Sequence, residues 1–340
     1  MITLFEDFKV KGLRLKNRIV MAPMCQYSSD ENGFVKDWHI FHYASRAVGG
    51  VGLIILEATS VEPDGRISFN DLGIWSEQHV EGLKRLTSAI HENGSKVAIQ
   101  LAHAGRKSRT AVLPIAPSVI RFSNSEKYRQ PVQMDKNRID EVADNFSKAA
   151  ERAVLAGFDA VEIHAAHGYL INEFFSPLTN KRKDEYGGSL ENRARFLKEI
   201  VQGVKSKMPH DMPLMIRVSA DDYYEGGNKV GDVAEILNHI SDMIDVVDVS
   251  GGGIMPENHV NTFPGYQLDN AAKIKEITGL YTIGGGLITT YPLAEYAVNT
   301  KCDLVYFGRQ LLREPYWPLK AAKEAGIELE WPFQYERAKF

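Results

Sequence analysis

The chain has little of several features that would assign a protein class at once. Only two cysteines, Cys25 and Cys302, occur in 340 residues, which excludes a disulfide framework and makes the reducing cytoplasm the expected location. No apolar run approaches the roughly 18 residues of a membrane-spanning helix. The residues after Met1 include Glu6 and Asp7, whereas a secretory leader has a basic segment followed by an apolar one. We therefore expect neither a membrane span nor a leader.

A strong net charge and the common nucleotide-binding motifs are also missing. The chain has 44 acidic residues and 40 Lys and Arg residues, which gives a formal net charge of −4. We therefore expect no nucleic-acid partner and no anionic membrane partner. There is no internal repeat, no Walker A motif and no G-x-G-x-x-G motif. The glycine groups Gly49–Gly52, Gly251–Gly253 and Gly284–Gly286 do not fit the latter. This argues against a doubly wound open sheet, which is the second choice for the fold.

What the chain does contain is a series of short apolar runs rich in β-branched residues. Several are almost continuously apolar, which is typical of strands that are buried on both faces of a parallel sheet. The runs are Arg18–Met21, Leu53–Glu57, Lys96–Leu101, Ala160–His164, Leu214–Val218, Val246–Val249, Tyr281–Ile283 and Leu304–Phe307.

Helix-like stretches alternate with these runs. Gly94 and Gly157 mark the ends of two of them, and Ser189 is a candidate N-cap for a third. Strict alternation of strand and helix predicts one domain over residues 1–340 that folds as a closed (β/α)₈ TIM barrel. The predicted helices are His79–Asn93, Ile139–Ala156, Leu190–Lys207, Asp232–Met243, Asp269–Thr278, Tyr291–Asn299 and Gln310–Gly326.

Two segments lie outside the repeat. Phe8–Lys16 alternates around Gly12, which predicts a β-hairpin that caps the bottom of the barrel. The stretch from Ala104 to about Arg138, after the third strand, contains several prolines and little periodicity. Loops of this length are usually functional, so it is interpreted as a lid, with a flexible insertion as the alternative.

In a TIM barrel the chemistry lies at the carboxyl ends of the strands, so the residues that follow each run are the candidate site. Glycines after the seventh and eighth runs, with Arg309, predict a phosphate site, although tight turns alone would also explain the glycines. The strand-end groups are Ala22–Tyr27, Glu57–Ala58, Gln100 with His103, His164–Tyr169, Arg217, Ser250–Gly253, Gly284–Gly286 and Gly308–Arg309.

The most informative short motif is His164-x-x-His167-x-Tyr169. Two histidines at a barrel mouth suggest a metal, but the first strand offers no further ligand, so no metal is expected. The favoured interpretation is a pair of N–H donors for a negative oxygen, with Tyr169 as a proton donor. Histidines that only fill polar pockets remain an alternative.

Three further strand-end residues allow more than one interpretation. Cys25 could be a nucleophile or a small packing residue. Gln100 can both donate and accept hydrogen bonds, which suits the edge of a pyrimidine-like ring, and Arg217 beside such a ring would stabilise negative charge. A purely structural role is open for both.

Several longer motifs, in order, resemble the Old Yellow Enzyme family, and the resemblance extends from near Leu4 to Arg337. It is closest to the bacterial thermophilic-like ene-reductases of the NADPH dehydrogenase type, a subdivision carried by Cys25, Tyr27 and Arg337. Ala22 departs from the serine of many relatives. The motifs are Lys16–Tyr27, Gln100–Lys107, Glu162–Leu170, Phe175–Asn180 and Asp184–Arg193.

The resemblance implies a tightly but non-covalently bound FMN, with NADPH or NADH as the reductant. Cys25 would lie near the reactive face of the flavin and tune its potential. Ala58, Gln100 and Arg217 would bind the ring edge. The complete set of implied cofactor-binding residues is Pro23, Met24, Cys25, Ala58, Gln100, Arg217, Gly286, Gly308 and Arg309.

The resemblance also implies a reaction and a substrate pocket. An activated C=C bond of an α,β-unsaturated carbonyl, nitro compound or quinone would accept hydride from flavin N5. His164 and His167 would hold its activating oxygen and Tyr169 would supply the proton. Arg337 would reach the active site of a neighbouring subunit in a homodimer or homotetramer. The implied substrate-binding residues are Tyr27, Lys107, His164, His167, Tyr169 and Arg337.

Two other functions remain open from the residues. A phosphate-substrate barrel without flavin, such as an aldolase or isomerase, would use Glu57 or Glu162 as its chemical group, although no lysine ends a strand. A flavin-storage protein without turnover would need neither the histidine pair nor Tyr169.

Overall fold

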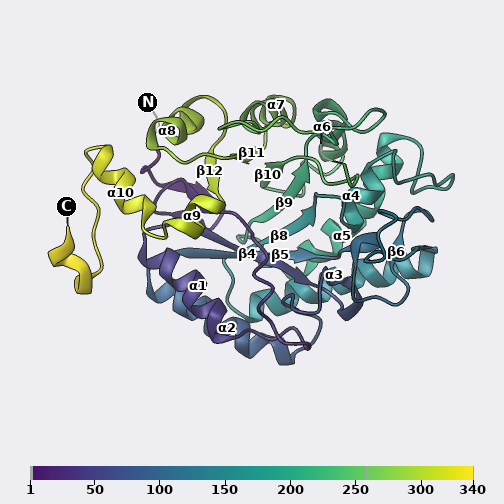
Figure 1. Ribbon diagram of the computed structural model, residues 1–340, viewed down its shortest axis with the longest axis horizontal. Coiled ribbons are helices and arrows are strands. Elements are labelled where there is room, and N and C mark those ends of the chain that lie inside the picture. Colours follow the sequence, from purple (N-terminus) through teal and green to yellow (C-terminus); the bar gives the residue numbers. More distant parts are fainter. Residues whose placement is uncertain (1–2, 258, 340) are drawn as a thin grey trace.

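The computed structural model describes residues 3–257 and 259–339. Within them, parallel strands close into a barrel, in which β12 pairs with β3 (Figure 1). This confirms the predicted TIM barrel, and every apolar run forms one of its strands. The barrel strands are β3 (Ile19–Met21), β4 (Leu53–Ser60), β5 (Lys96–Ala102), β8 (Ala160–Ala165), β9 (Leu214–Ser219), β10 (Val246–Ser250), β11 (Tyr281–Gly284) and β12 (Leu304–Phe307).

Helices surround the barrel as an outer layer (Figure 1). The Ser189 hydroxyl accepts the Asn192 N–H at the start of α5, and Gly94 and Gly157 follow the ends of α2 and α3 with positive φ, as predicted. Among the described residues, no helix combines the length and the apolar character that crossing a bilayer requires. The outer helices are α1 (Asp37–Val48), α2 (Gln78–Glu92), α3 (Lys136–Leu155), α5 (Leu190–Lys207), α6 (Val230–Asn238), α7 (Leu268–Thr278), α8 (Tyr291–Thr300) and α10 (Trp317–Glu324).

Three helices differ from the sequence prediction. No helix was predicted over α1, whose buried face contains His39, His42 and Arg46 instead of an aliphatic stripe. Helix α6 ends at Asn238, before the predicted Met243. The predicted helix Gln310–Gly326 is two helices, α9 (Arg309–Arg313) and α10. Pro315 lies between them, and a proline has no N–H and disfavours helical backbone in the residue before it.

The predicted N-terminal hairpin is confirmed and closes one end of the barrel. Strands β1 (Phe8–Val10) and β2 (Leu13–Leu15) pair antiparallel. Their apolar side chains belong to one buried cluster with the inward-facing residues of the barrel strands, such as Leu53 and Met215. The Gly12 N–H also donates to the Asp211 carbonyl at 2.8 Å. The hairpin therefore fills the amino-terminal end and leaves the opposite end for chemistry.

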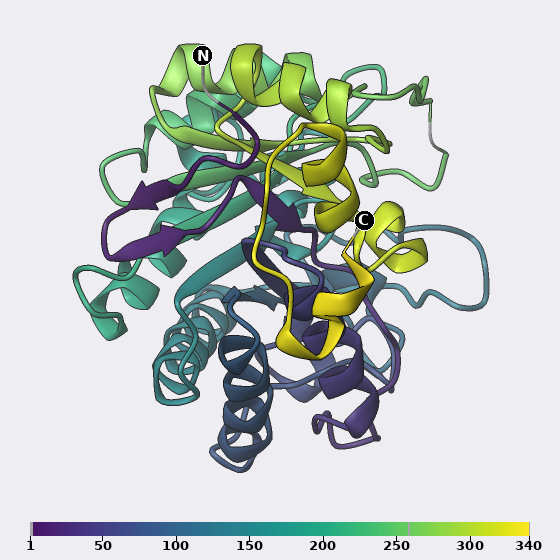
Figure 2. The same cartoon turned by 90° about the vertical axis from the view of Figure 1, so that its left-hand side faces the viewer.

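The C-terminal segment runs along the outside of the molecule, close to α1 (Figure 2). It includes the 3₁₀ turn η3 (Phe333–Ala338), which has no buried residue. Trp331, Pro332 and Gln334 line a cavity of about 650 Å³ with the ends of α1 and α2. The segment thus packs only loosely on the barrel.

The long connection after β5 is anchored. It contains a one-turn helix, η2 (Gly105–Lys107), and two short parallel strands, β6 (Ile115–Ala116) and β7 (Val132–Gln133). The Arg182 guanidinium donates to the carbonyls of Pro117 (3.2 Å) and Met134 (2.7 Å). Arg106 of η2, almost fully buried, donates to the carbonyl of Ile120. These bonds argue against the flexible insertion, and the function as a lid stays a prediction.

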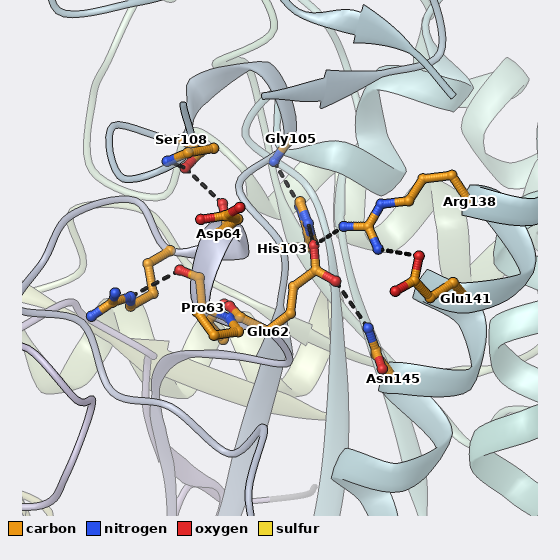
Figure 3. Close-up of polar contacts among 12 residues, drawn as sticks. Glu62, Pro63, Asp64, His103, Gly105, Ser108, Arg138, Glu141 and Asn145 are labelled. Atoms are coloured by element: carbon orange, nitrogen blue, oxygen red, sulfur yellow. Dashed lines mark hydrogen bonds and ion pairs between the residues drawn. The ribbon is translucent and has the colours of Figure 1, made fainter. Parts of the chain in front are cut away.

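Glu62, just after β4, holds the start of this connection in place (Figure 3). It accepts a hydrogen bond from His103 Nε2 at 2.6 Å and another from Asn145 at 2.9 Å, and it pairs with Arg138 of α3. His103 Nδ1 in turn accepts the N–H of Gly105 at 3.0 Å. Burial disfavours the charged carboxylate, but attraction and hydrogen bonds from His103 and Arg138 outweigh it and lower the pKa of Glu62 to about 2.

We predict that Glu62→Gln destabilises the protein in a pH-dependent way. The pKa of Glu62 falls from 4.5 to about 2 on folding, so its stabilisation is complete above pH 4.5 and is lost as pH falls toward 2. Urea unfolding should show a loss of about 2 to 3 kcal/mol at pH 7, which shrinks as the pH is lowered. Glu141→Gln is the control, because its 2.8 Å pair with Arg138 is exposed and worth less than about 1 kcal/mol. An equal loss at all pH values would contradict the assignment.

Candidate active site

The carboxyl ends of β8 and β9 bring several of the predicted site residues together around His164. This histidine is the fifth residue of β8 and is nearly fully buried. Its ring lies edge-on to His167, with centroids 5.2 Å apart, and to Tyr169 at 5.0 Å. On the next strand, Arg217 is its register partner. The spacing of the motif therefore does gather its three rings.

His164 is a neutral hydrogen-bond donor. Its Nδ1 accepts the N–H of Ala166 at 3.2 Å, so the ring proton is on Nε2. Burial, and then repulsion from Arg217 and Lys107, hold the pKa of His164 well below its usual value. A neutral imidazole N–H in a site that excludes water can stabilise negative charge on an oxygen without losing its own proton.

His167 is held differently. It has a positive φ of 58°, and its backbone N–H donates to the Ser219 hydroxyl at 2.8 Å. Its Nε2 lies 2.7 Å from the Ser250 hydroxyl. Burial and the charge of Arg217 also lower the pKa of His167. One of its two ring nitrogens is thus already engaged by the end of β10.

Tyr169 and Lys107 form one wall of the site. Burial raises the pKa of the Tyr169 phenol well above its usual value, with smaller contributions from Cys25 and Tyr27. The Lys107 ammonium donates to the carbonyls of His167 (2.8 Å) and Gly253 (3.2 Å) and lies 4.9 Å from the centre of the Tyr169 ring. Burial and the nearby Arg106 lower the pKa of Lys107 to about 8. Tyr169 therefore keeps its proton at neutral pH.

Cys25 and Tyr27 come from the loop after β3. Desolvation, followed by the charges of Asp71 and Glu57, raises the pKa of the Cys25 thiol. This keeps the sulfur protonated and argues against a nucleophilic thiolate. Tyr27 is 49% exposed, and burial of its remaining surface raises its pKa to about 12. It lies at the rim.

Gln100 and Arg217 lie inside the barrel, as predicted. The Gln100 amide donates to Glu162 at 2.7 Å. The Arg217 guanidinium pairs with Asp248 at 3.0 Å, reaches the Pro23 carbonyl at 3.5 Å and lies over the Tyr306 ring at 5.6 Å. Both residues therefore lie within a buried polar layer near the loop that follows β3.

A cavity of about 240 Å³ leads from Arg217 to the predicted phosphate site. Gly286, Gly308 and Arg309 all line it. Arg309 donates no hydrogen bond to any described residue, so its guanidinium remains available for an anion. At Gly286, which has φ +98°, a Cβ atom would lie 2.7 Å from the ring of Tyr266. The backbone shape and the space both require glycine here.

The other predicted residues divide into two groups. Ala58 is buried in β4, just after a bulge, and Pro23 and Met24 lie in the loop after β3. Arg337, in contrast, is exposed on the C-terminal segment, and its side chain makes no hydrogen bond or ion pair with another described residue. Within one chain it is not brought to the site.

The bulge in β4 determines what Glu57 can do. The register shifts between Leu56 and Ala58, and the Glu57 carboxylate accepts the Gln26 N–H (2.7 Å) and the Tyr43 hydroxyl of α1 (3.2 Å). Burial raises the pKa of Glu57 to about 8. Its two oxygens are occupied by structural donors.

Sequence reasoning overlooked three residues that line the cavity or face the site, Tyr306, Gln267 and Asp248, and gave Ser250 no role of its own. The inward position of Tyr306 follows from alternation along β12, and Ser250 was noted only as a strand end. Gln267 precedes α7, far from any predicted strand end, so no signal indicated it; it donates to Ser250 at 3.2 Å. Asp248 was hidden within an apolar run. Among residues 3–257 and 259–339, no three His, Cys, Asp or Glu side chains are grouped as a metal site.

The sequence matches the NADH:flavin oxidoreductase / NADH oxidase family over residues 3–328. It is 50% identical over 338 residues to the NADPH dehydrogenase of Clostridium acetobutylicum, covering 98% of this chain and 99% of that protein. An NADPH dehydrogenase of Geobacillus sp. (strain WCH70) is also 50% identical, over 337 residues and 98% of both chains.

Solved structures share the fold. An old yellow enzyme homologue from Zymomonas mobilis superimposes with a TM-score of 0.83 at 27% identity, covering 99% of this chain and 98% of that one. Morphinone reductase gives 0.80 at 27% identity, with 97% and 91% covered. A 2-naphthoyl-CoA reductase gives 0.90 at 28% identity, but this chain spans only 52% of that longer one.

Proposed function

Because the chain belongs to the NADH:flavin oxidoreductase / NADH oxidase family, we propose that it reduces the activated C=C bond of α,β-unsaturated carbonyl, nitro or quinone-type compounds. It is an oxidoreductase of the Old Yellow Enzyme type, with FMN as its cofactor and a reduced nicotinamide as its reductant. The observation that carries the proposal is the buried His164 ring, edge-on to Tyr169 with centroids 5.0 Å apart, where burial keeps the imidazole neutral and the phenol protonated.

The residues present fit FMN. Arg309 has an unused guanidinium in a cavity whose backbone at Gly286 leaves no room for a side chain, as close approach to a phosphate requires. Gly308 lines the same end of the cavity. At the other end, Arg217 would face the electron-rich edge of the ring system. The same cavity thus offers positive charge for both the phosphate and the ring.

The remaining cofactor contacts follow from the buried layer. Gln100 has one amide hydrogen on Glu162, which leaves its carbonyl oxygen and second N–H for the donors and acceptors of the ring edge. Ala58, Pro23 and Met24 would pack against the ring, and Cys25 would contact it as a neutral thiol. Bound FMN supplies the hydride, and holding it non-covalently requires no further chemistry from the chain.

Hydrogen bonds to its carbonyl or nitro oxygen would activate the substrate. His164 would donate its Nε2 proton to the carbonyl or nitro oxygen, and His167 would give a second hydrogen bond through the nitrogen that Ser250 does not hold. Negative charge grows on that oxygen as the β-carbon accepts hydride, so these bonds strengthen in the transition state. Neutral histidines suit this role because they need no proton transfer of their own.

Tyr169 would donate the proton that completes the reduction at the α-carbon. Its raised pKa keeps the phenol protonated at neutral pH, and the Lys107 ammonium 4.9 Å from its ring centre would stabilise the phenolate that forms. The proton would be replaced from solvent at the rim, where Tyr27 is partly exposed. Tyr27 and Lys107 would border the substrate.

We further propose that Arg337 completes the site of a neighbouring subunit in a homodimer or homotetramer. The exposed position of Arg337 and the loose packing of its segment support this. The family match argues against the flavin-independent aldolase or isomerase alternative. Glu57 does not suit it either, because both of its oxygens already accept hydrogen bonds from Gln26 and Tyr43.

The first experiment is the visible spectrum of the purified protein, followed by p-hydroxybenzaldehyde and then by an enone with NADPH. We expect flavin bands, a long-wavelength charge-transfer band and turnover. In His164→Ala the flavin bands should remain, the charge-transfer band should disappear and kcat should fall by about 10² to 10³. His210→Ala, at an exposed position, is the control. A protein that stays colourless with added FMN refutes the function, and normal turnover by His164→Ala refutes the donor role.

A second prediction concerns the phosphate end. Gly286→Ala forces an alanine into φ +98° and against the Tyr266 ring, so titration of the apoprotein with FMN should show Kd raised about tenfold to a hundredfold. Gly279→Ala is the matched control: its φ is +70°, but a Cβ there meets nothing within 4 Å. We expect only a small loss of stability in the control. Equal FMN affinities in the two variants would contradict the phosphate assignment.

A further inference from the structure

The buried polar layer inside the barrel contains more negative groups than its function as a cofactor cradle needs. Glu162 of β8 and Asp248 of β10 are both fully buried, and they flank β9, which carries Arg217. Each carboxyl group needs a partner in order to ionise, because an isolated carboxylate is strongly disfavoured in a site that excludes water. One guanidinium cannot neutralise two carboxylates.

The two carboxyl groups have unequal partners. Asp248 is the register neighbour of Arg217 and lies 3.0 Å from its Nε. Glu162 receives a hydrogen bond from the neutral amide of Gln100 at 2.7 Å, and its other oxygen, Oε2, is buried without a hydrogen-bond partner among the described residues. Both oxygens of Asp248 also lack a hydrogen bond among the described residues, but Asp248 forms an ion pair with Arg217, and Glu162 forms none with a described residue. An ionised Asp248 therefore has a direct positive partner, whereas an ionised Glu162 would not.

On the basis of the proposed function, we propose that Glu162 carries a proton at neutral pH and acts as a positioning residue that sets the net charge beside the pyrimidine edge of the flavin. With Glu162 neutral, Arg217 and Asp248 cancel. If Glu162 loses its proton to solvent, the layer gains one negative charge next to the ring that must accept electrons. The oxidised flavin is then favoured and its midpoint potential falls.

The electrostatics of the layer agree with this geometry. Burial, and next the charge of Asp248, raise the pKa of Glu162, although Arg217 acts in the opposite direction. Burial also raises the pKa of Asp248, but Arg217 is its direct partner and opposes the shift. The pair therefore releases its second proton only above neutral pH.

The other groups that face the layer do not supply a competing charge at neutral pH. Tyr306 of β12 lies beneath the Arg217 guanidinium, and burial raises its pKa. Tyr266 is affected in the same way. His164, two residues beyond Glu162 on β8, is kept neutral by burial and by Arg217. Lys107 and Glu57, elsewhere at the site, also have pKa values of about 8, so the alkaline step assigned to Glu162 is the one that E162Q removes.

The test compares the FMN-loaded wild type with E162Q and D248N. Glutamine at 162 keeps an acceptor for the Gln100 amide but cannot ionise. In D248N, Glu162 becomes the only carboxyl group beside Arg217 and should ionise. Each protein then has one positive and one negative group in the layer at neutral pH, but only the wild type can gain another negative charge.

We expect the plots of flavin midpoint potential against pH for wild type and E162Q to run parallel near neutral pH. As the pH rises they should separate, with the wild type more negative. D248N should follow E162Q. Infrared difference spectra between the wild type and each variant should show the C=O stretch of a protonated carboxylic acid that is present in the wild type. This band should be lost in both E162Q and D248N. Parallel potentials over the whole range, or a wild-type spectrum without the acid band, would overturn the proposal.

Two safeguards keep the outcomes distinct. If D248N does not fold or does not hold FMN, the infrared spectra and midpoint potentials of the wild type and E162Q alone decide whether Glu162 carries the proton. If the wild type itself binds no FMN, the proposed function fails. A wild type that binds FMN and reduces enones but has the same potential profile as E162Q refutes only the role of Glu162.

Discussion

The structure depends on one constraint, the exclusion of water from the carboxyl end of a closed barrel that is rich in ionisable side chains. There a side chain must be neutral or directly paired. His164 and Tyr169 satisfy this by staying neutral, because burial lowers the pKa of one and raises that of the other. Arg217 satisfies it by pairing with Asp248. A neutral imidazole N–H and a protonated phenol are the states that the proposed reduction needs, so burial prepares both groups for it.

The same constraint explains how the loops of the site are held. Lys107 uses its ammonium to bridge the carbonyls of His167 and Gly253, which joins the loop after β5 to those after β8 and β10. Glu62 gathers His103 and donors from α3 behind that loop. Buried charges here serve as ties between segments that no apolar contact would position so specifically. The proposed proton on Glu162 meets the same constraint beside the cofactor, because it keeps that carboxyl group neutral.

The accuracy of the sequence predictions varied with the kind of signal. The apolar runs identified every barrel strand because each strand is buried on both faces. Helix α1 carried no comparable signal, since His39, His42 and Arg46 form part of its buried face. Pro315 divides the last predicted helix, and the rule for proline could have indicated it. The bulge between Leu56 and Ala58 had no signal in the sequence, yet it changes the register of β4 at Glu57 and Ala58.

By itself, the sequence determined the barrel, the end of the barrel where the polar residues collect and the family, because periodicity and motif order are local properties of the chain. Only the tertiary structure decided the state of each group. The proton of His164 is on Nε2 because Ala166 donates to Nδ1, and His167 faces Ser250 from another strand. Glu162 and Asp248, 86 positions apart in the chain, compete for one arginine. Burial and pairing are relations between distant segments, and no local pattern encodes them.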